Sequence, residues 1–539
     1  MAIGTAASRI TGFARTLLLV TVLGVGGVKQ AFDVANTMPN ILYTLLIGGM
    51  LTSTLVPQLV QARTRGQDDA YTQWLLTVVV LGLAGVSALS IGLAPLLIRL
   101  YSHTHDPEQL DLTITWARYF LPQILFYGMS AVVSAVLNVR GRFAAPVWAP
   151  VLNNLVVIAT VIGFALTRDG GEPTPASLTS GQRAVLGVGT TLGVAVMTAV
   201  LLPSLVASGF RWRRGRGFRG IGLRRTGRLL PWALVYVGAT QLSYLVLSRL
   251  ATGVDQFAEY TLAVVVWQLP HAVITASVIA ALLPRMSRHA VFGRPDLLRR
   301  DLDRALRVTT LLLAPAAVAL VVLGRQTSVT LFAHGHTSMA DAERVGLVLS
   351  ILALGLLPYS GYQAQARAFY ALDDARSPAL VQVAVSSVQI LVNLLAAATL
   401  PAGVRVLGLA GGIVVANGTG AVLSTVLLRR RLGAVSPARD RPGATGRTPT
   451  TRTLVRMGLA AVTGGAAAAV LAAVLAPVVP EGWTGGAVVL AAASPALLIT
   501  YLAALLLLRV REARRALELY TPRLCPPASR RSRQDGGRG

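Results

Sequence analysis

The segment LYSHTHD at residues 100–106 returns as LFAHGHT at residues 331–337, so that His103 and His334 stand 231 residues apart. Three further pairs of segments repeat at offsets between 227 and 232 residues: NTMPNILY (36–43) with VWQLPHAV (266–273), STLVPQL (53–59) with AALLPRM (280–286), and NVRGRFAAP (138–146) with LDDARSP (372–378). A nearly constant offset through four separate pairs predicts that a unit of roughly 230 residues is duplicated in this chain.

The composition is that of a polytopic membrane protein. Hydrophobic residues make up 54% and charged residues 13% of the 539 residues, and the mean hydropathy is +0.62; no soluble domain of this length has such values. A window of about 20 residues, the length of a helix that crosses a bilayer, finds fourteen apolar spans, at 6–27, 36–60, 74–98, 114–138, 147–167, 184–208, 229–250, 259–283, 307–324, 345–370, 379–400, 406–428, 456–478 and 487–508. The predicted fold class is all-α.

The repeat groups these spans into two lobes of six helices and two extra C-terminal helices. Six is an even number, so the two lobes share one orientation and are expected to be related by an axis along the membrane normal, with a central cavity between them. The predicted units are an N-lobe at 1–228, a C-lobe at 229–430, a cytoplasmic linker at 431–455, helices 13 and 14 at 456–510, and a basic tail at 511–539.

The net charge of +27 is mainly a signal of topology. Arginines collect in every second connection, with eight in 211–228 alone, whereas the alternate connections are neutral or acidic. The positive-inside rule then places both termini in the cytoplasm and the chain in the cytoplasmic membrane, where the arginines also attract anionic membrane lipids. Nucleic acid is not expected as a partner, because no basic domain interleaved with aromatic residues is present.

The segment SRITGFAR (8–15) places Arg9 and Arg15 in the first span. Arginine inside a membrane usually faces a water-filled interior or a counter-charge, and its guanidinium fork matches phosphate in a bidentate manner. On an ideal helix the two arginines point about 120° apart, so they converge on one ligand only if the helix bends, for which Gly12 offers a place. Pairing with a nearby acid or contact with lipid headgroups remains an alternative for both arginines.

The second span carries a polar face, which is not expected to contact lipid. Its residues follow the i, i+3, i+4, i+7 spacing of one helical face: Asp33, Asn36, Thr37, Asn40, Tyr43 and Thr44. The equivalent span of the second lobe is more aromatic and neutral, with Tyr260, Trp267, His271 and Thr275 on one face and Gln268 at its edge. Interhelical hydrogen bonds and packing are the alternative role for these residues.

Together the quoted segments resemble the MurJ (MviN-type) family of lipid II flippases. The resemblance covers about residues 1–510, and its motifs are ASRITGFAR (7–15), AFDVANTMPNILYTLLIGGMLTSTLVPQLV (31–60), LNVRGRFAAPVWAPVLNN (137–154), WQLPHAVITASVIAALLPRMSR (267–288) and ARAFYALDDARSPALVQV (366–383). It implies a fourteen-helix member of the multidrug/oligosaccharidyl-lipid/polysaccharide exporter superfamily. Such a protein moves the lipid-linked peptidoglycan precursor to the outer leaflet by alternating access and serves bacterial cell-wall synthesis.

The resemblance also assigns roles to residues. Arginines of the first helix, here Arg9 and Arg15, bind the pyrophosphate in the family, and helices 13 and 14 form a groove thought to hold the polyprenyl tail. Many family members carry charged residues where this chain has Tyr43, Thr44, Gly48, Val265 and Gln268, so its cavity is less charged than the family pattern. The predicted substrate-binding residues are Arg9, Arg15, Asp33, Asn36, Asn40, Tyr43, Gln268 and His271.

Two other classes of function stay open at this stage. One is a cation-coupled exporter of drugs or other lipid-linked saccharides from the same superfamily, and the other is a membrane scaffold whose basic loops and tail recruit cell-wall synthesis proteins. An enzyme is not expected, because no span carries a paired carboxylate or a Ser-His-Asp set. Neither a cofactor nor a metal is predicted, since Cys525 is the only cysteine and the paired histidines are interpreted as duplicated loop chemistry.

The arginine distribution gives a first test. A reporter inserted within 211–228, 290–300 or 436–450 is expected to signal from the cytoplasm, and one within 169–182 from the outside. Paired alkaline phosphatase and fluorescent protein fusions at each point measure this directly. A cytoplasmic signal from 169–182 would overturn the fourteen-span map.

Overall fold

The computed structural model describes residues 2–45, 59, 68–168, 170–211, 230–432 and 450–513, and within these ranges it contains helices and no β-strand. The all-α prediction is confirmed. The first half contains α1 (Ala2–Leu23), α2 (Gly27–Tyr43), α4 (Asp68–Gly92), α5 (Ala94–Tyr101), α6 (Pro107–Phe120), α7 (Gln123–Val139), α8 (Ala144–Leu166), α9 (Ser180–Ala199) and α10 (Leu201–Ala207).

The second half runs from α11 to α19. Its helices are α11 (Leu230–Thr252), α12 (Phe257–Pro270), α13 (Ala276–Val291), α14 (Pro295–Val322), α15 (Gly324–Phe332), α16 (Met339–Leu354), α17 (Leu356–Ala371), α18 (Arg376–Thr399) and α19 (Arg405–Arg431). A π-helical turn, η4 (His271–Thr275), joins α12 to α13, and a 3-10 turn, η5 (Ala402–Val404), precedes α19. Two further helices, α20 (Thr450–Leu475) and α21 (Trp483–Leu507), follow this half.

Membrane-length helices account for most of the predicted spans. Among the described residues, twelve helical segments are long and apolar enough to cross a bilayer, and α16 with α17, bent by 47°, makes a thirteenth if the pair is one span. The predicted span at 36–60 falls partly outside the described residues, so the number fourteen stays a prediction. Residues 28–35, which were expected to connect the first two predicted spans, belong to α2.

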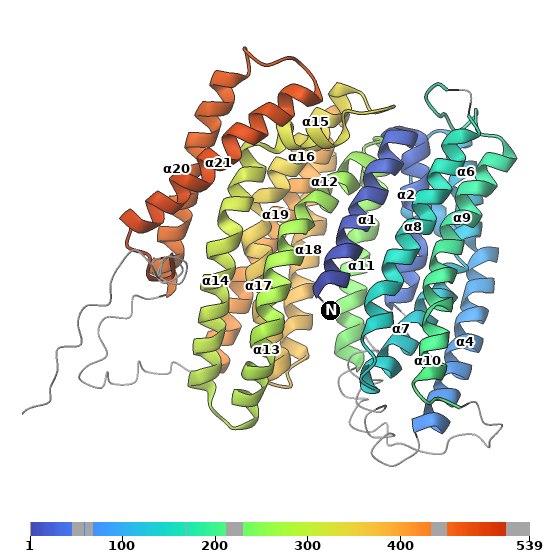
Figure 1. The fold of residues 1–539 in the computed structure, drawn as a ribbon, viewed down its shortest axis with the longest axis horizontal. Coiled ribbons are helices and arrows are strands. Elements are labelled where there is room, and N and C mark those ends of the chain that lie inside the picture. The colour runs from blue at the N-terminus through green and yellow to red at the C-terminus, as the bar shows by residue number, and fades with distance from the viewer. Residues whose placement is uncertain are drawn as a thin grey trace, which may run out of the picture.

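The two halves pair their helices in the same way. In the first half α1 packs on α8, α2 on α6, and α8 on α9; in the second half α11 packs on α18, α12 on α16, and α18 on α19. Figure 1 shows the halves side by side, with α20 and α21 at the outer edge of the second half, where α20 contacts α14 and α21 contacts α15. Equivalent segments of the sequence repeat therefore make equivalent contacts.

The repeated histidine segments each reach across to the other half. The backbone N–H of His103, before α6, donates a hydrogen bond to Thr252 Oγ1 at the end of α11 (2.9 Å). The backbone N–H of His336, before α16, donates to the carbonyl oxygen of Thr21 near the end of α1 (3.2 Å). Thr21 and Thr252 are themselves 231 residues apart. The duplication therefore extends to the contacts that join the halves.

One of these crossings requires a glycine. Gly335 has a φ of +62°, a left-handed conformation that is costly for residues with a Cβ atom. A Cβ atom at Gly335 would lie 2.2 Å from the carbonyl oxygen of Thr21, which is far inside contact distance. The loop between α15 and α16 therefore lies as close to α1 as its backbone allows.

We expect Gly335→Ala to lower the thermal stability of the detergent-solubilised protein more than Gly293→Ala does. Gly293 has a φ of +63° and open space around the position of a Cβ atom. Both variants therefore bear the left-handed backbone cost of about 1–2 kcal/mol, but only Gly335→Ala also pushes the loop away from α1. Equal melting temperatures for the two variants would show that the contact between the halves contributes nothing.

Candidate substrate site

A small cavity lies where α1 and α2 of the first half meet α12 of the second half. Its volume is about 140 Å³, and its lining residues are Arg15, Thr16, Leu19, Lys29, Phe32, Asp33, Asn36, Val157, Thr190, Thr261, Leu262 and Val265. This volume suits several waters or one phosphate-sized group, and a disaccharide or a peptide does not fit. The cavity holds two cationic side chains and one carboxylate.

Arg15 is the cation of this cavity that forms no ion pair with any residue the structure describes. Its side chain is half-buried, and its Nε atom is buried without a hydrogen-bond partner in the described part of the chain. Asp33 and Tyr127 are the groups that interact with it electrostatically at longer range. A buried guanidinium with an unused donor is ready to bind an acceptor such as a phosphate oxygen.

Lys29, by contrast, has its counter-charge one helical turn away. It is only 3% exposed and forms an ion pair with Asp33 at the i, i+4 spacing of α2. Asp33 Oδ2 also accepts a hydrogen bond from Thr261 Oγ1 of α12 (2.8 Å), across the boundary between the halves. The pair therefore neutralises itself and at the same time connects α2 to α12.

Gln30 makes a second connection at the same end of α2. Its Nε2 donates to Asp255 Oδ1 (2.9 Å), and its Oε1 accepts from the backbone N–H of Phe257 at the start of α12 (3.2 Å). The first turns of α2 and α12 are thereby held together. The cavity that contains Arg15 is closed on this side by polar contacts between the two halves.

A family model described as lipid II flippase MurJ matches residues 19–492 of the sequence. The chain belongs to the MurJ family of lipid II flippases. A probable lipid II flippase MurJ of Rhizobium meliloti (strain 1021) is 28% identical over 80% of both chains, and a lipid II flippase MurJ of Burkholderia cenocepacia is 28% identical over 80% of this chain and 83% of the relative. The protein is thus a multi-pass membrane transporter of the MurJ family.

Solved structures share the fold. A structure of lipid II flippase MurJ in an inward closed conformation aligns with a TM-score of 0.73 at 16% identity, covering 96% of this chain and 99% of that one. A multidrug resistance transporter of the MATE family, in an inward-facing conformation, aligns with a TM-score of 0.63 at 17% identity over 80% of this chain and 98% of that one. Both likenesses concern the fold alone.

The structure brings together three of the predicted substrate-binding residues of this MurJ family member. Arg15, Asp33 and Asn36 line the cavity, whereas Arg9 and Asn40 are exposed outside it. Helix α1 is continuous from Ala2 to Leu23, with no break at Gly12. The position of Gly12 serves close packing instead, because a Cβ atom there would lie 3.3 Å from the Asn154 side chain of α8.

The other predicted residues lie elsewhere. Tyr43 packs against Tyr127 of α7, with ring centroids 5.9 Å apart. His271 Nδ1 is 2.8 Å from Ser360 Oγ of α17, and Gln268 is exposed. Neither Gln268 nor His271 lines the Arg15 cavity, to which α12 contributes Thr261, Leu262 and Val265 instead.

Lys29 and Thr261 were missed by the sequence analysis. Lys29 is the only lysine of the chain and stands four residues before Asp33, which is the spacing of an ion pair on one helical face. That pattern was available in the sequence. Nothing in the sequence pointed to Thr261, because its role depends on the contact between α2 and α12.

We expect Asp33→Ala to destabilise the protein by about 3–5 kcal/mol, because it leaves Lys29 buried without a counter-charge. The double variant Lys29→Met/Asp33→Leu is expected to recover most of this loss, since neither charge is then buried. Glu343→Ala, which breaks a more exposed pair with Arg325, serves as control and is expected to cost about 1 kcal/mol or less. Denaturation of the purified protein measures all three, and a double variant no more stable than Asp33→Ala would contradict the pairing.

Proposed function

We propose that this flippase moves lipid II from the inner to the outer leaflet by alternating access, without a catalytic step, and that Arg15 binds the pyrophosphate. The observation that carries the proposal is the Nε atom of Arg15, which is buried in a cavity between the two halves and has no hydrogen-bond partner among the described residues. Arginine suits this task because its donors match phosphate oxygens in pairs. We infer the identity of the substrate from the family to which the chain belongs, and the cavity offers a place for the charged group of that substrate.

The cavity is large enough for only one part of the substrate. Only a phosphate-sized group fits beside Arg15 in this conformation, so the disaccharide and peptide would remain outside the closed region. Lys29 lines the same cavity, and its charge is already offset by Asp33. Arg15 therefore offers the principal uncompensated positive charge to an entering phosphate.

Movement to an outward-open state would require the two halves to separate at the end where α2 meets α12. Hydrogen bonds between the halves would have to break there, and five of them are Gln30 with Asp255 and with Phe257, Thr261 with Asp33, His103 with Thr252, and His336 with Thr21. A hydrogen bond contributes a net 0.5–1.5 kcal/mol in typical cases, so these five amount to roughly 2.5–7.5 kcal/mol. Substrate binding and membrane energy are able to offset a cost of this size.

The orientation and the domain boundaries belong to the same proposal. Both termini would lie in the cytoplasm, because the arginine-rich connections lie on that side by the positive-inside rule. The boundaries at 228, 430, 455 and 510 follow from the sequence repeat and the arginine-rich linker. Cell-wall synthesis proteins are possible partners of the basic loops and tail, which offer a positive surface to acidic segments.

We expect Arg15→Ala to abolish outward movement of lipid II while the protein still inserts in the membrane. Arg15→Lys is expected to recover little, because the charge returns without the guanidinium fork. Loss of one charge-assisted contact typically costs about 1.5–3 kcal/mol, which is roughly ten- to hundredfold in affinity. Arg9→Ala is the matched control on the same helix and is expected to be mild, since Arg9 is exposed outside the cavity.

The measurement is the fraction of lipid II accessible at the outer leaflet in cells that depend on this protein, with membrane abundance checked by immunoblot. Full activity of Arg15→Ala at equal abundance would remove Arg15 from the substrate site. Depletion of the protein is expected to cause lipid-linked precursor to accumulate. Drug hypersensitivity without accumulation would instead favour an exporter.

A further inference from the structure

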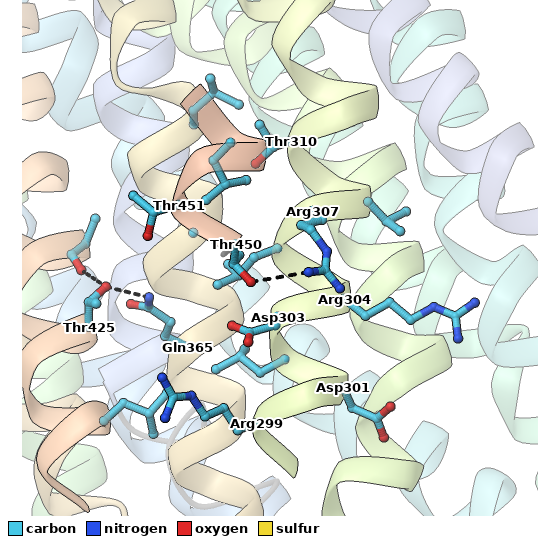
Figure 2. Close-up of a pocket in the computed structure, with 18 of the residues that line it drawn as sticks. Arg299, Asp301, Asp303, Arg304, Arg307, Thr310, Gln365, Thr425, Thr450 and Thr451 are labelled. Carbon is cyan, nitrogen blue, oxygen red and sulfur yellow. Dashed lines mark hydrogen bonds between the residues drawn. The ribbon is translucent and has the colours of Figure 1, made fainter. Parts of the chain in front are cut away.

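A second and much larger cavity opens in the other half of the molecule. It has a volume of about 1400 Å³ and lies between α14, α17, α19 and α20, close to Glu512. Figure 2 shows arginine, aspartate and threonine side chains from α14 and α20 around it, together with Gln365 of α17 and Thr425 of α19. None of its lining residues belongs to the Arg15 cavity.

Arginines outnumber carboxylates in the lining of this cavity. The five arginines are Arg299, Arg300, Arg304, Arg307 and Arg429, and the three carboxylates are Asp301, Asp303 and Glu512. Arg307 is occupied, since its Nε lies 3.0 Å from Glu512 Oε1 and its Nη1 donates to Thr450 (3.3 Å). Asp301 is also ion-paired, because its Oδ1 lies 3.2 Å from Arg285 Nη2.

The four remaining arginines form no ion pair within the described ranges. Arg299 and Arg429 come from different helices, α14 and α19, and both interact electrostatically with Asp303, which is therefore shared between them and Arg307. The cavity thus has an excess of positive charge.

The lining of the cavity changes from charged to apolar along α14. The charged lining residues of α14 lie between Arg299 and Arg307, and the apolar wall continues through Leu311, Leu312 and Leu454. From Arg299 to Leu311 the helix rises about 18 Å, which is enough to pass from the headgroup region into the hydrocarbon. A ligand that fills this space has an anionic head and an apolar body.

A buried acceptor adds a polar feature next to the arginines. Gln365 is 6% exposed, and its Nε2 donates to Thr425 Oγ1 (2.7 Å). Its Oε1 is buried without a donor in the described part of the chain. An acceptor in this position suits a hydroxyl group of a ligand, since leaving it unpaired is costly.

We propose that this cavity binds an anionic glycerophospholipid of the cytoplasmic leaflet, with its phosphate between Arg299 and Arg429, a headgroup hydroxyl directed towards Gln365, and its acyl chains along α14 and α20. Basic pockets between membrane helices on the cytoplasmic side are suited to such headgroups. The arginine-rich ends of α14 and α19 place the cavity on that side by the positive-inside rule. The site is independent of the proposed role of Arg15, so either can fail without the other.

The test uses the purified full-length protein and short-chain phosphatidylglycerol as the probe. We expect phosphatidylglycerol to raise the melting temperature in a saturable manner, because a ligand that binds the folded state stabilises it. Phosphatidylcholine, which carries no net charge, is expected to have little effect. The double variant Arg299→Gln/Arg429→Gln is expected to weaken the apparent affinity for phosphatidylglycerol roughly tenfold or more.

The matched control is Arg294→Gln/Arg430→Gln, which removes the same charge from two exposed arginines on the same side of the protein that do not line the cavity. It is expected to bind phosphatidylglycerol like the wild type. A third variant, Gly458→Leu, fills the cavity without any change of charge. Gly458 lines the cavity and has open space where a Cβ atom would be, so this variant is expected to weaken binding while the fold is kept.

Three results would overturn the proposal. Equal loss of affinity in the two double variants would mean that general surface charge attracts the lipid. A full shift of the melting temperature with glycerol 3-phosphate would identify a site for free phosphate. Binding of undecaprenyl phosphate with no binding of phosphatidylglycerol would assign the cavity to the polyprenyl carrier.

Discussion

Lys29 and Asp33 neutralise each other on one face of α2, and much of the arrangement around the candidate site depends on this pair. Single charges inside an apolar assembly cost several kilocalories per mole, whereas a pair at i, i+4 spacing permits the helix to begin at Gly27 among buried neighbours. Asp33 then has a free lone pair for Thr261 of α12. The same pairing consumes the nearest carboxylate, so Arg15 keeps a donor unused.

The two repeats of the sequence make equivalent contacts with each other. Each repeat presents its histidine-containing segment to the end of the first helix of the other repeat, at Thr252 and at Thr21. The hydrophobic cores follow the same principle, because the core of the first half includes Phe257 of α12 and that of the second includes Val20 of α1. Contacts of this kind join the halves at one end without fusing them, which is the arrangement that a rocking transporter needs.

The two halves contribute unequally to the Arg15 cavity. The first half supplies Arg15, Lys29 and Asp33 to the cavity, and the second half supplies only Thr261, Leu262 and Val265. Arginine also occurs in different surroundings: it collects in every second connection, in α1 Arg15 has a buried Nε atom without a hydrogen-bond partner among the described residues, and on α14 and α19 arginines line the larger cavity. The surroundings of each guanidinium, and not its identity, determine which purpose it serves.

The sequence by itself determined the all-α class, most of the membrane spans, the repeat and the family, because apolar length, period and offset are properties of contiguous residues. It also named Arg15, Asp33 and Asn36 as residues of one predicted site, and these three line one cavity. Only the tertiary structure decided that Arg9 is exposed and does not line the Arg15 cavity, and that His271 lies within hydrogen-bond distance of Ser360. It likewise decided that residues as distant as Arg299 and Arg429 share a cavity. The rotation of a helix about its axis and the identity of its neighbours are set by packing between distant segments, and no local pattern encodes them.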